Sequence, residues 1–145
     1  MGNPVMSDDG LGPYILKQLK KMPQIRGVSY YNAATDSLSC FQLLKDTGKI
    51  LIVDALHGGY SPGTTYRIRA NRLNLDSMHM FSLHEMHLLH LAARFFPERL
   101  REITVLAVEP ENIEPGLSLS AMVQSAVPLL IRLIIQEISR IKTVI

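Results

Sequence analysis

Three separate stretches of this sequence carry side chains that can bind a metal ion. Two adjacent carboxylates, Asp8 and Asp9, lie in an opening segment rich in Gly, Asn and Pro. Asp54 ends a strongly apolar run, and His84 lies near the start of a later apolar segment. The simpler interpretation of the two aspartates is that Ser7 or Asp8 caps the helix that follows them. A shared metal or catalytic site is the alternative hypothesis, because two further metal-binding side chains follow in the chain.

Other chemistry-bearing residues are weaker candidates. His84, His87 and His90 recur every third residue, but such a stripe drifts around a helix and no carboxylate follows at the spacing of a zinc protease. The single cysteine, Cys40, lies in no motif of an activated thiolate and excludes an intramolecular disulfide. No Gly-x-Ser-x-Gly or His-Glu-x-x-His motif occurs. We therefore expect neither a three-histidine site nor thiol catalysis, and the lone cysteine indicates a reducing compartment.

Composition places the chain among ordinary single-domain proteins. Its 145 residues are 47% hydrophobic and 19% charged, with a formal net charge of +2. That charge is too small to indicate a nucleic-acid partner, and the first residues lack the basic and apolar regions of a signal peptide. The most apolar segment, residues 126–135, is too short to span a bilayer. We expect one cytoplasmic domain spanning residues 1–145, monomeric and without membrane insertion.

Helical and strand patterns alternate along the chain and place the candidate residues at element ends. Helices are expected at residues 9–22, 36–44, 82–96 and, from Ser118 or Ser120, to 141; strands are expected at residues 28–31, 49–56, 64–69 and 102–108. This alternation predicts a three-layer α/β/α sandwich with a mostly parallel sheet, in which residues 64–69 form an edge strand. Asp54 then lies at the carboxyl end of a buried strand, where its carboxylate is either solvated at the edge of the sheet or part of a site, because open α/β sheets bind ligands there.

Seven short motifs, in five parts of the chain, occur in order over nearly its whole length. They are Gly-Asn-Pro and Ser-Asp-Asp-Gly-Leu-Gly within residues 2–12, Ile-Val-Asp-Ala at 52–55, Pro-Gly-Thr at 62–64, Ser-Leu-His at 82–84, and Val-Glu-Pro and Gly-Leu-Ser-Leu-Ser within 108–120. Each motif alone is weak, but the ordered set resembles the hydrogenase maturation endopeptidases. That family trims the carboxyl-terminal peptide from the large subunit of nickel-iron hydrogenases.

The resemblance implies that Asp9, Asp54 and His84 bind nickel and form the catalytic site. Carboxylate and imidazole groups suit a borderline divalent metal, and three ligands leave coordination positions open for a substrate. In this family the precursor supplies the nickel, so no permanent metal of the enzyme is expected. Cleavage would depend on positioning of the peptide bond and on polarisation of its carbonyl group or of water by the metal. Asp8 is either a second carboxylate of this site or a helix cap.

The function implied by the resemblance is that of an endopeptidase. Such an aspartyl protease-like hydrolase activates its hydrogenase by removing the carboxyl-terminal peptide of the nickel-loaded large-subunit precursor. The alternative is a non-catalytic nickel- or precursor-binding maturation factor. A nucleotide or phosphate binder is disfavoured, because the opening turn carries two acids where a phosphate needs amides or cations.

Two departures from the family pattern favour the non-catalytic alternative. The family begins with an apolar strand before the opening turn, whereas only Met1 precedes that turn here, so we expect this first strand to be missing from the N-terminus. Residues 32–35 are Asn-Ala-Ala-Thr, where the family has an acidic residue, two glycines and Thr or Ser. The alanine methyl groups disfavour a positive φ or a close approach of the substrate.

Overall fold

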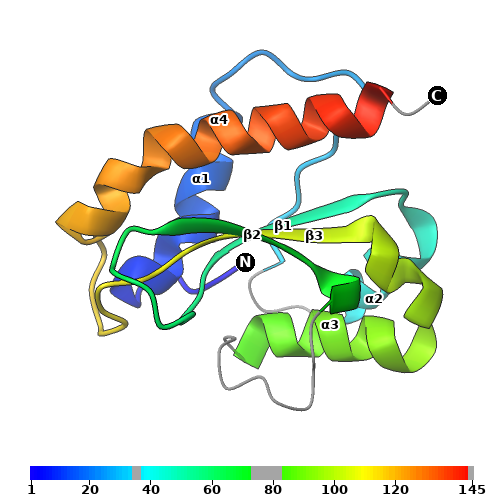
Figure 1. The fold of residues 1–145 in the computed structure, drawn as a ribbon, viewed down its shortest axis with the longest axis horizontal. Helices are drawn as coiled ribbons and strands as arrows, with labels where there is room; N and C mark the ends of the chain where they lie inside the picture. Colours follow the sequence, from blue (N-terminus) through cyan, green and yellow to red (C-terminus); the bar gives the residue numbers. More distant parts are fainter. Residues whose placement is uncertain (34–36, 73–82, 144–145) are drawn as a thin grey trace.

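The computed structural model describes residues 1–33, 37–72 and 83–143, and in this part of the chain a three-stranded sheet lies between two layers of helices (Figure 1). The strands are β1 (Ile50–Ala55), β2 (Thr65–Arg69) and β3 (Ile103–Val108). The longer helices are α1 (Leu11–Leu19), α2 (Ser37–Asp46), α3 (Leu83–Phe95) and α4 (Ala121–Thr143). Short 3-10 helices are η1 (Ser7–Gly10), η2 (Ala70–Arg72) and η4 (Pro97–Glu102).

β3 is the central strand of the described sheet, and its sequence explains this position. The spatial order is β1-β3-β2, with β1 parallel to β3 and β2 antiparallel to it. Val105 and Ala107 pack into the core formed with α2 and α3, whereas Leu106 and Val108 pack into the core formed with α1 and α4. A strand that is buried on both faces requires a continuous apolar run, and residues 103–108 supply it.

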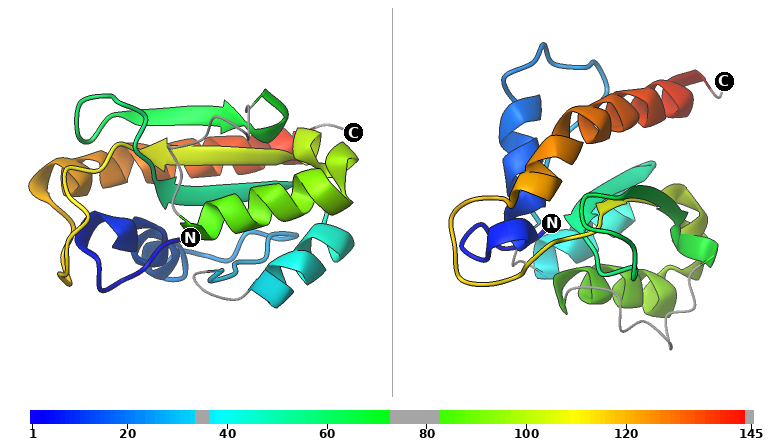
Figure 2. Two further views of the ribbon diagram at one scale, coloured as in Figure 1. Left: turned by 90° about the horizontal axis from the view of Figure 1, so that it is seen from below. Right: turned by 60° about the vertical axis from the view of Figure 1, so that its left-hand side comes forward.

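The layers follow the sequence-based prediction. Figure 2 shows α2 and α3 on one face of the sheet and α1 and α4 on the other. The three-layer α/β/α arrangement is therefore confirmed, as is the edge position of the strand predicted at residues 64–69, which is β2. The described sheet has two strand pairs: β1 and β3 are parallel, and β2 and β3 are antiparallel.

The strand predicted at residues 28–31 is wrong. The structure has no strand there, although Val28 and Tyr30 pack against the core formed with α1 and α4. β-propensity reflects packing of side chains on a pleated surface, and it does not create a strand where no neighbouring strand pairs with the backbone. The first helix is also shorter than predicted, because residues 7–10 form η1 and α1 ends at Leu19.

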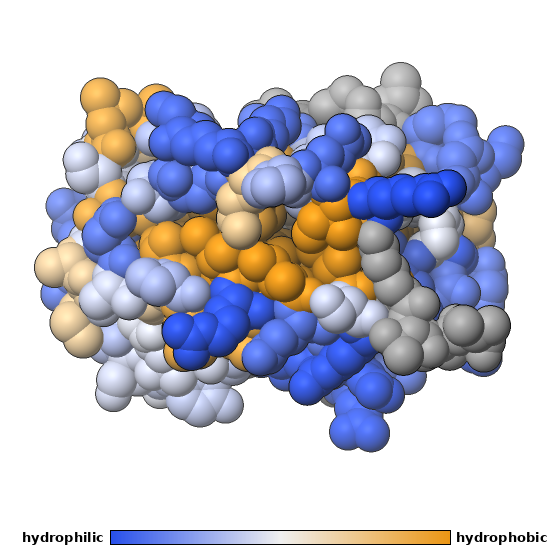
Figure 3. Space-filling model, turned by 90° about the horizontal axis from the view of Figure 1, so that it is seen from above, coloured by the Kyte–Doolittle hydropathy of each residue, from blue (hydrophilic) through white to orange (hydrophobic). Residues whose placement is uncertain are grey.

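A groove of about 440 Å³ runs along the edge of β1 that faces away from β3. Apolar residues of β1, α1 and α4 line it, among them Leu51, Leu19 and Ile138. Figure 3 shows hydrophobic surface gathered in the middle of this face, with hydrophilic residues on both sides. At one end the ammonium group of Met1 donates a hydrogen bond to the carbonyl oxygen of Val53 at 2.6 Å. No strand of the described residues pairs with β1 on this side.

α4 is longer than the apolar segment singled out in the sequence. Its stretch Ala121–Ile141, 21 residues, is long and apolar enough to cross a membrane by length and composition, and 39% of an 18-residue window within it is buried in the fold. Residues 126–135 are thus part of a longer apolar helix, so their length alone does not decide the question, and the expected absence of membrane insertion stays a prediction. A core helix of a soluble protein passes the same test, so the helix by itself assigns no membrane location.

Candidate functional site

The structure places two of the three predicted site residues at the carboxyl end of the parallel strands. Asp54 lies near the end of β1 and is completely buried, and its Oδ1 accepts a hydrogen bond from the amide of Ala55 at 2.9 Å. Asp9 lies in η1 and is 6% exposed. Its Oδ2 accepts a hydrogen bond from the amide of Asn3 at 2.8 Å. Backbone amides therefore orient both carboxylates.

Gly2 lies close to both of these aspartates. It has a φ of 105°, and a Cβ atom added to it would lie 1.9 Å from the backbone oxygen of Asp9 and 2.9 Å from Oδ1 of Asp54. Any other residue would clash with the backbone of Asp9 and would strain at this positive φ. Glycine at this position therefore allows the opening turn to fold against the end of β1, which brings the backbone of Asp9 and the carboxylate of Asp54 close to one residue.

The third predicted ligand is the second residue of α3. In Figure 1, α3 runs toward η4 and the amino end of β3, so its first turn, with His84, is the end nearer to the carboxyl ends of the strands. The side chains of His84 and His87 lie outside the described residues, as do Ser82, the expected cap of this helix, and the side chain of Cys40. Among the side chains that are described, no three His, Cys, Asp or Glu residues are grouped to hold a metal. Nickel binding by Asp9, Asp54 and His84 stays a prediction.

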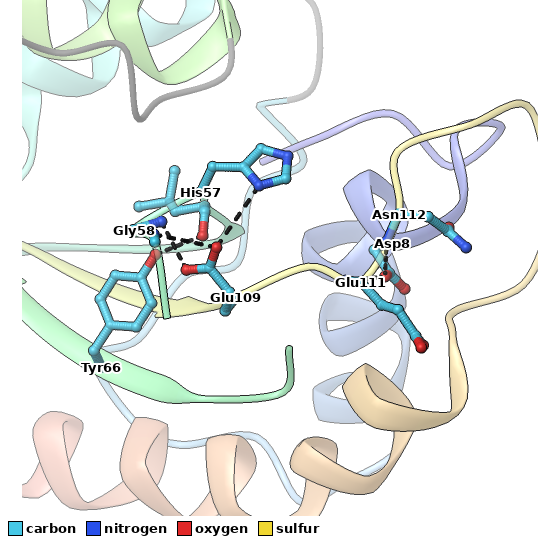
Figure 4. A network of polar contacts seen from close by, with 9 residues as sticks. Asp8, His57, Gly58, Tyr66, Glu109, Glu111 and Asn112 are labelled. Carbon is cyan, nitrogen blue, oxygen red and sulfur yellow. Dashed lines mark hydrogen bonds and ion pairs between the residues drawn. The ribbon is translucent and has the colours of Figure 1, made fainter. Parts of the chain in front are cut away.

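Asp8 links three distant parts of the chain and does not cap the first helix. It is completely buried, and neither η1 nor α1 has a side-chain cap. Its Oδ2 accepts hydrogen bonds from the amides of Glu111 at 2.8 Å and Asn112 at 3.1 Å (Figure 4). Its Oδ1 accepts from the amide of Ser120 at 2.7 Å, and the Ser120 hydroxyl donates to Oδ2 at 2.8 Å. The prediction that Asp8 caps the helix after it is therefore wrong, because loops far away in sequence use its carboxylate.

Ser120 is the residue through which Asp8 reaches α4. Its Oγ accepts a hydrogen bond from the amide of Val123 at 3.3 Å, which is the pattern of an N-cap. The prediction that Ser118 or Ser120 starts the last helix is confirmed for Ser120, because α4 begins at Ala121. One serine thus caps the N-terminus of α4 and also anchors the opening segment to it.

A second buried acid organises the loop after β1, and the sequence-based prediction missed this function. Glu109 directly follows β3 and is 4% exposed. Its Oε2 accepts a hydrogen bond from the amide of Gly58 at 2.7 Å, and its Oε1 accepts from Gly59 at 3.3 Å. Nδ1 of His57, an exposed side chain, lies 3.7 Å from Oε1 (Figure 4). The sequence did contain a signal for this function. Glu109 directly follows an apolar strand, as Asp54 ends one, so the two acids could have been expected at the same edge of the sheet.

One further acid is buried among the described residues, and it lies away from this end of the sheet. Glu137 of α4 accepts two hydrogen bonds from Arg67 of β2, from Nε at 3.0 Å and from Nη2 at 2.6 Å. These bonds hold the pKa of Glu137 below its usual value and raise the pKa of Arg67. The four other buried acids, Asp8, Asp9, Asp54 and Glu109, belong to the carboxyl end of the strands.

Buried carboxylates at the carboxyl ends of parallel strands, in a sandwich of this kind, define a ligand- or substrate-binding α/β protein. The family model described as hydrogenase maturation protease matches residues 13–137. The chain therefore belongs to the hydrogenase maturation protease family, and it is an endopeptidase by membership of that family. The resemblance noted in the motifs is confirmed.

Individual relatives agree with the family match. The chain is 27% identical over 146 residues to the Methanocaldococcus jannaschii protein named "Putative hydrogenase maturation protease MJ0253", covering 96% of this chain and 93% of the relative. The hydrogenase maturating endopeptidase HybD from E. coli has a similar structure, with a TM-score of 0.80 and 21% identity over 96% of this chain and 88% of that one. HybD from Thermococcus kodakarensis gives a TM-score of 0.70 and 23% identity, covering 93% of each chain. The structural likeness supports the fold.

Proposed function

We propose that this endopeptidase removes the carboxyl-terminal peptide from a nickel-loaded large-subunit precursor of a nickel-iron hydrogenase. The nickel belongs to the precursor, and Asp9, Asp54 and His84 would bind it when the substrate docks. The observation that carries this proposal is that the backbone oxygen of Asp9 and Oδ1 of Asp54 both lie close to Gly2, so the segments that carry the two oriented carboxylates meet at the carboxyl edge of the sheet. The lone cysteine supports a reducing, cytoplasmic location.

The burial of the two carboxylates explains why a metal-bearing substrate suits them. A buried carboxylate has lost most of its hydration, and a divalent cation restores the lost interaction. Hydrogen bonds from Asn3 to Asp9 and from Ala55 to Asp54 fix the two groups before the substrate arrives. The protein would therefore contribute by holding the precursor so that one peptide bond lies beside its nickel, where the carbonyl group is polarised and water adds to the carbonyl carbon as the amine leaves.

The test compares nickel-loaded with nickel-free precursor. We expect the protein to shorten only the nickel-loaded precursor, as followed by product mass. Asp54→Asn and His84→Ala should abolish cleavage, because each removes a proposed nickel ligand. Circular dichroism melting checks that both variants remain folded, and Glu98→Gln, at an exposed position on η4, serves as the active control.

Two results would count against the proposal. Equal cleavage of nickel-free precursor would show that the metal is not recognised. Tight binding of the nickel-loaded precursor without any cleavage would support the non-catalytic maturation factor instead.

A further inference from the structure

The end of the molecule that carries Asp9 and Asp54 has an unusual charge distribution. Residues 1–10, 54–64 and 109–122 contain six of the thirteen Asp and Glu residues of the chain and none of its fifteen Lys and Arg residues. Four of the six are buried, and two, Glu111 and Glu114, are exposed. Backbone amides bind the carboxylates of Asp8 and Glu109, and they do not cancel the charge. Even with the ammonium group of Met1 counted, these segments carry more negative than positive formal charge, so this end produces a negative potential toward an approaching partner.

The same three segments also carry a concentration of exposed apolar side chains. Nine large hydrophobic residues are exposed in the described part of the chain, and five of them belong to these segments. We call these five the apolar rim: Val5, Tyr60, Ile113, Leu117 and Met122. Leu117 is 84% exposed, so it contributes almost nothing to the core. Single exposed hydrophobic residues are common, but a group of them gathered at one end indicates a contact surface.

Hydrogen bonds join the segments that carry the rim. The amide of Gly116 donates to the carbonyl oxygen of Val5 at 3.0 Å, so Val5 and Leu117 flank one backbone bridge. Asp8 binds Asn112, the neighbour of Ile113, and Ser120, which precedes the first turn of α4 with Met122.

The loop after β1 is held in the same way. A Cβ atom on Gly63 would lie 2.8 Å from the carbonyl oxygen of Met122, so this loop packs directly on the start of α4. The ring of Tyr60 packs against Tyr66 of β2, with centroids 5.2 Å apart. All of these segments lie at the same end of the fold (Figure 1). The rim is therefore a preformed surface, which lowers the entropy lost when a partner docks.

We propose that the apolar rim, with Glu111 and Glu114, is the docking surface for the precursor segment next to the cleaved bond, and that this segment is apolar and basic. This inference rests on the proposed function. Apolar contacts supply affinity, and opposite charge steers the encounter and selects the partner. A nucleic acid or an anionic membrane would be repelled by the same potential. The segment would then lie beside Asp9, which adjoins Asp8 in η1.

The experiment uses two matched pairs of variants in the full chain. Met122→Ser in the rim is paired with Met22→Ser, because the two methionines are 47% and 41% exposed but lie in different parts of the fold. The double change Glu111→Gln and Glu114→Gln is paired with Glu98→Gln, another exposed glutamate. The probe is the nickel-loaded large-subunit precursor from the same organism. Its Kd is measured by titration in low and high salt, and KM and kcat for its cleavage are measured separately.

We expect Met122→Ser to raise Kd and KM roughly tenfold with kcat unchanged, and both controls to match the wild type. The charge-removing double variant should weaken binding at low salt and lose much of its effect at high salt, because screening already removes the attraction. Rim variants that bind like their controls would overturn the docking surface, even if the wild type cleaves normally. A wild type that binds through the rim but does not cleave would overturn only the endopeptidase proposal.

Discussion

Two regions of this protein bury acidic side chains, and they do so in opposite ways. Where β2 meets α4, the charge of Glu137 is matched by Arg67 through two hydrogen bonds. At the carboxyl end of the strands, Asp8 and Glu109 are held by backbone amides, in segments that contain no Lys or Arg. In the first arrangement the opposite charges of Arg67 and Glu137 offset each other, and the pair joins β2 to α4. The second lies beside Asp9 and Asp54, and its own segments offer no basic side chain to match their acids.

The largest effect is expected from Gly2→Ala, which disturbs the packing at the carboxyl end of the strands. The added Cβ atom would lie 1.9 Å from the backbone oxygen of Asp9, so the opening turn must move. We expect a loss of about 3 kcal/mol or more in the free energy of unfolding, together with loss of cleavage. Gly48→Ala is the control, because nothing lies within 4 Å of a Cβ atom there. Urea denaturation of both variants measures the difference, and equal midpoints would disprove the close packing around Gly2.

Asp8→Ala should have the next largest effect, because it removes the acceptor for three backbone amides and one hydroxyl group. We expect about 2 kcal/mol of destabilisation, since buried donors would lose their partners. Asp8→Asn removes the charge but keeps one acceptor oxygen, so it should lie between Ala and the wild type. Thermal unfolding ranks the three proteins. If Asp8→Asn were as damaging as Asp8→Ala, charge would matter more than the hydrogen bonds, against our description of this end.

The smallest effect is expected from the Arg67–Glu137 pair, and it depends on pH. Hydrogen bonding to Arg67 lowers the pKa of Glu137 below its usual 4.5. Its contribution to stability is therefore complete above pH 4.5 and is lost as the pH falls through the lower, folded-state pKa. Glu137→Gln should reduce the decrease in melting temperature on acidification, whereas the exposed control Glu98→Gln should not. Parallel melting curves for Glu137→Gln and the wild type between about pH 3 and 7 would contradict the assignment.

The sequence predicted features that depend on local pattern. Strand patterns located β1, β2 and β3, and the apolar run of β1 indicated burial on both faces. The position of Asp54 at a strand end followed from the same pattern. The strand expected at residues 28–31 failed because strand formation also needs a pairing partner, and no local signal reports whether one exists.

The hydrogen bonds at the carboxyl end could be predicted only in part. That Ser120 caps α4 was within reach of local reasoning, because capping is a local interaction. The bonds of Asp8 were not, since its partners Glu111 and Ser120 lie 103 and 112 residues away and only the folded sheet brings them together. The hydrogen bond from the amide of Gly58 to the carboxylate of Glu109 joins residues 51 positions apart, and it was missed for the same reason.

The groove along β1 has a consequence for the colloidal behaviour of the protein. In the described part of the chain, no strand pairs with the outer edge of β1, and apolar side chains lie beside that edge. This is the arrangement to which another extended chain adds. Solubility at high concentration therefore depends on keeping that edge covered, and ordered aggregation should begin at β1 while the hydrogen-bonded loops around Asp8 are still intact.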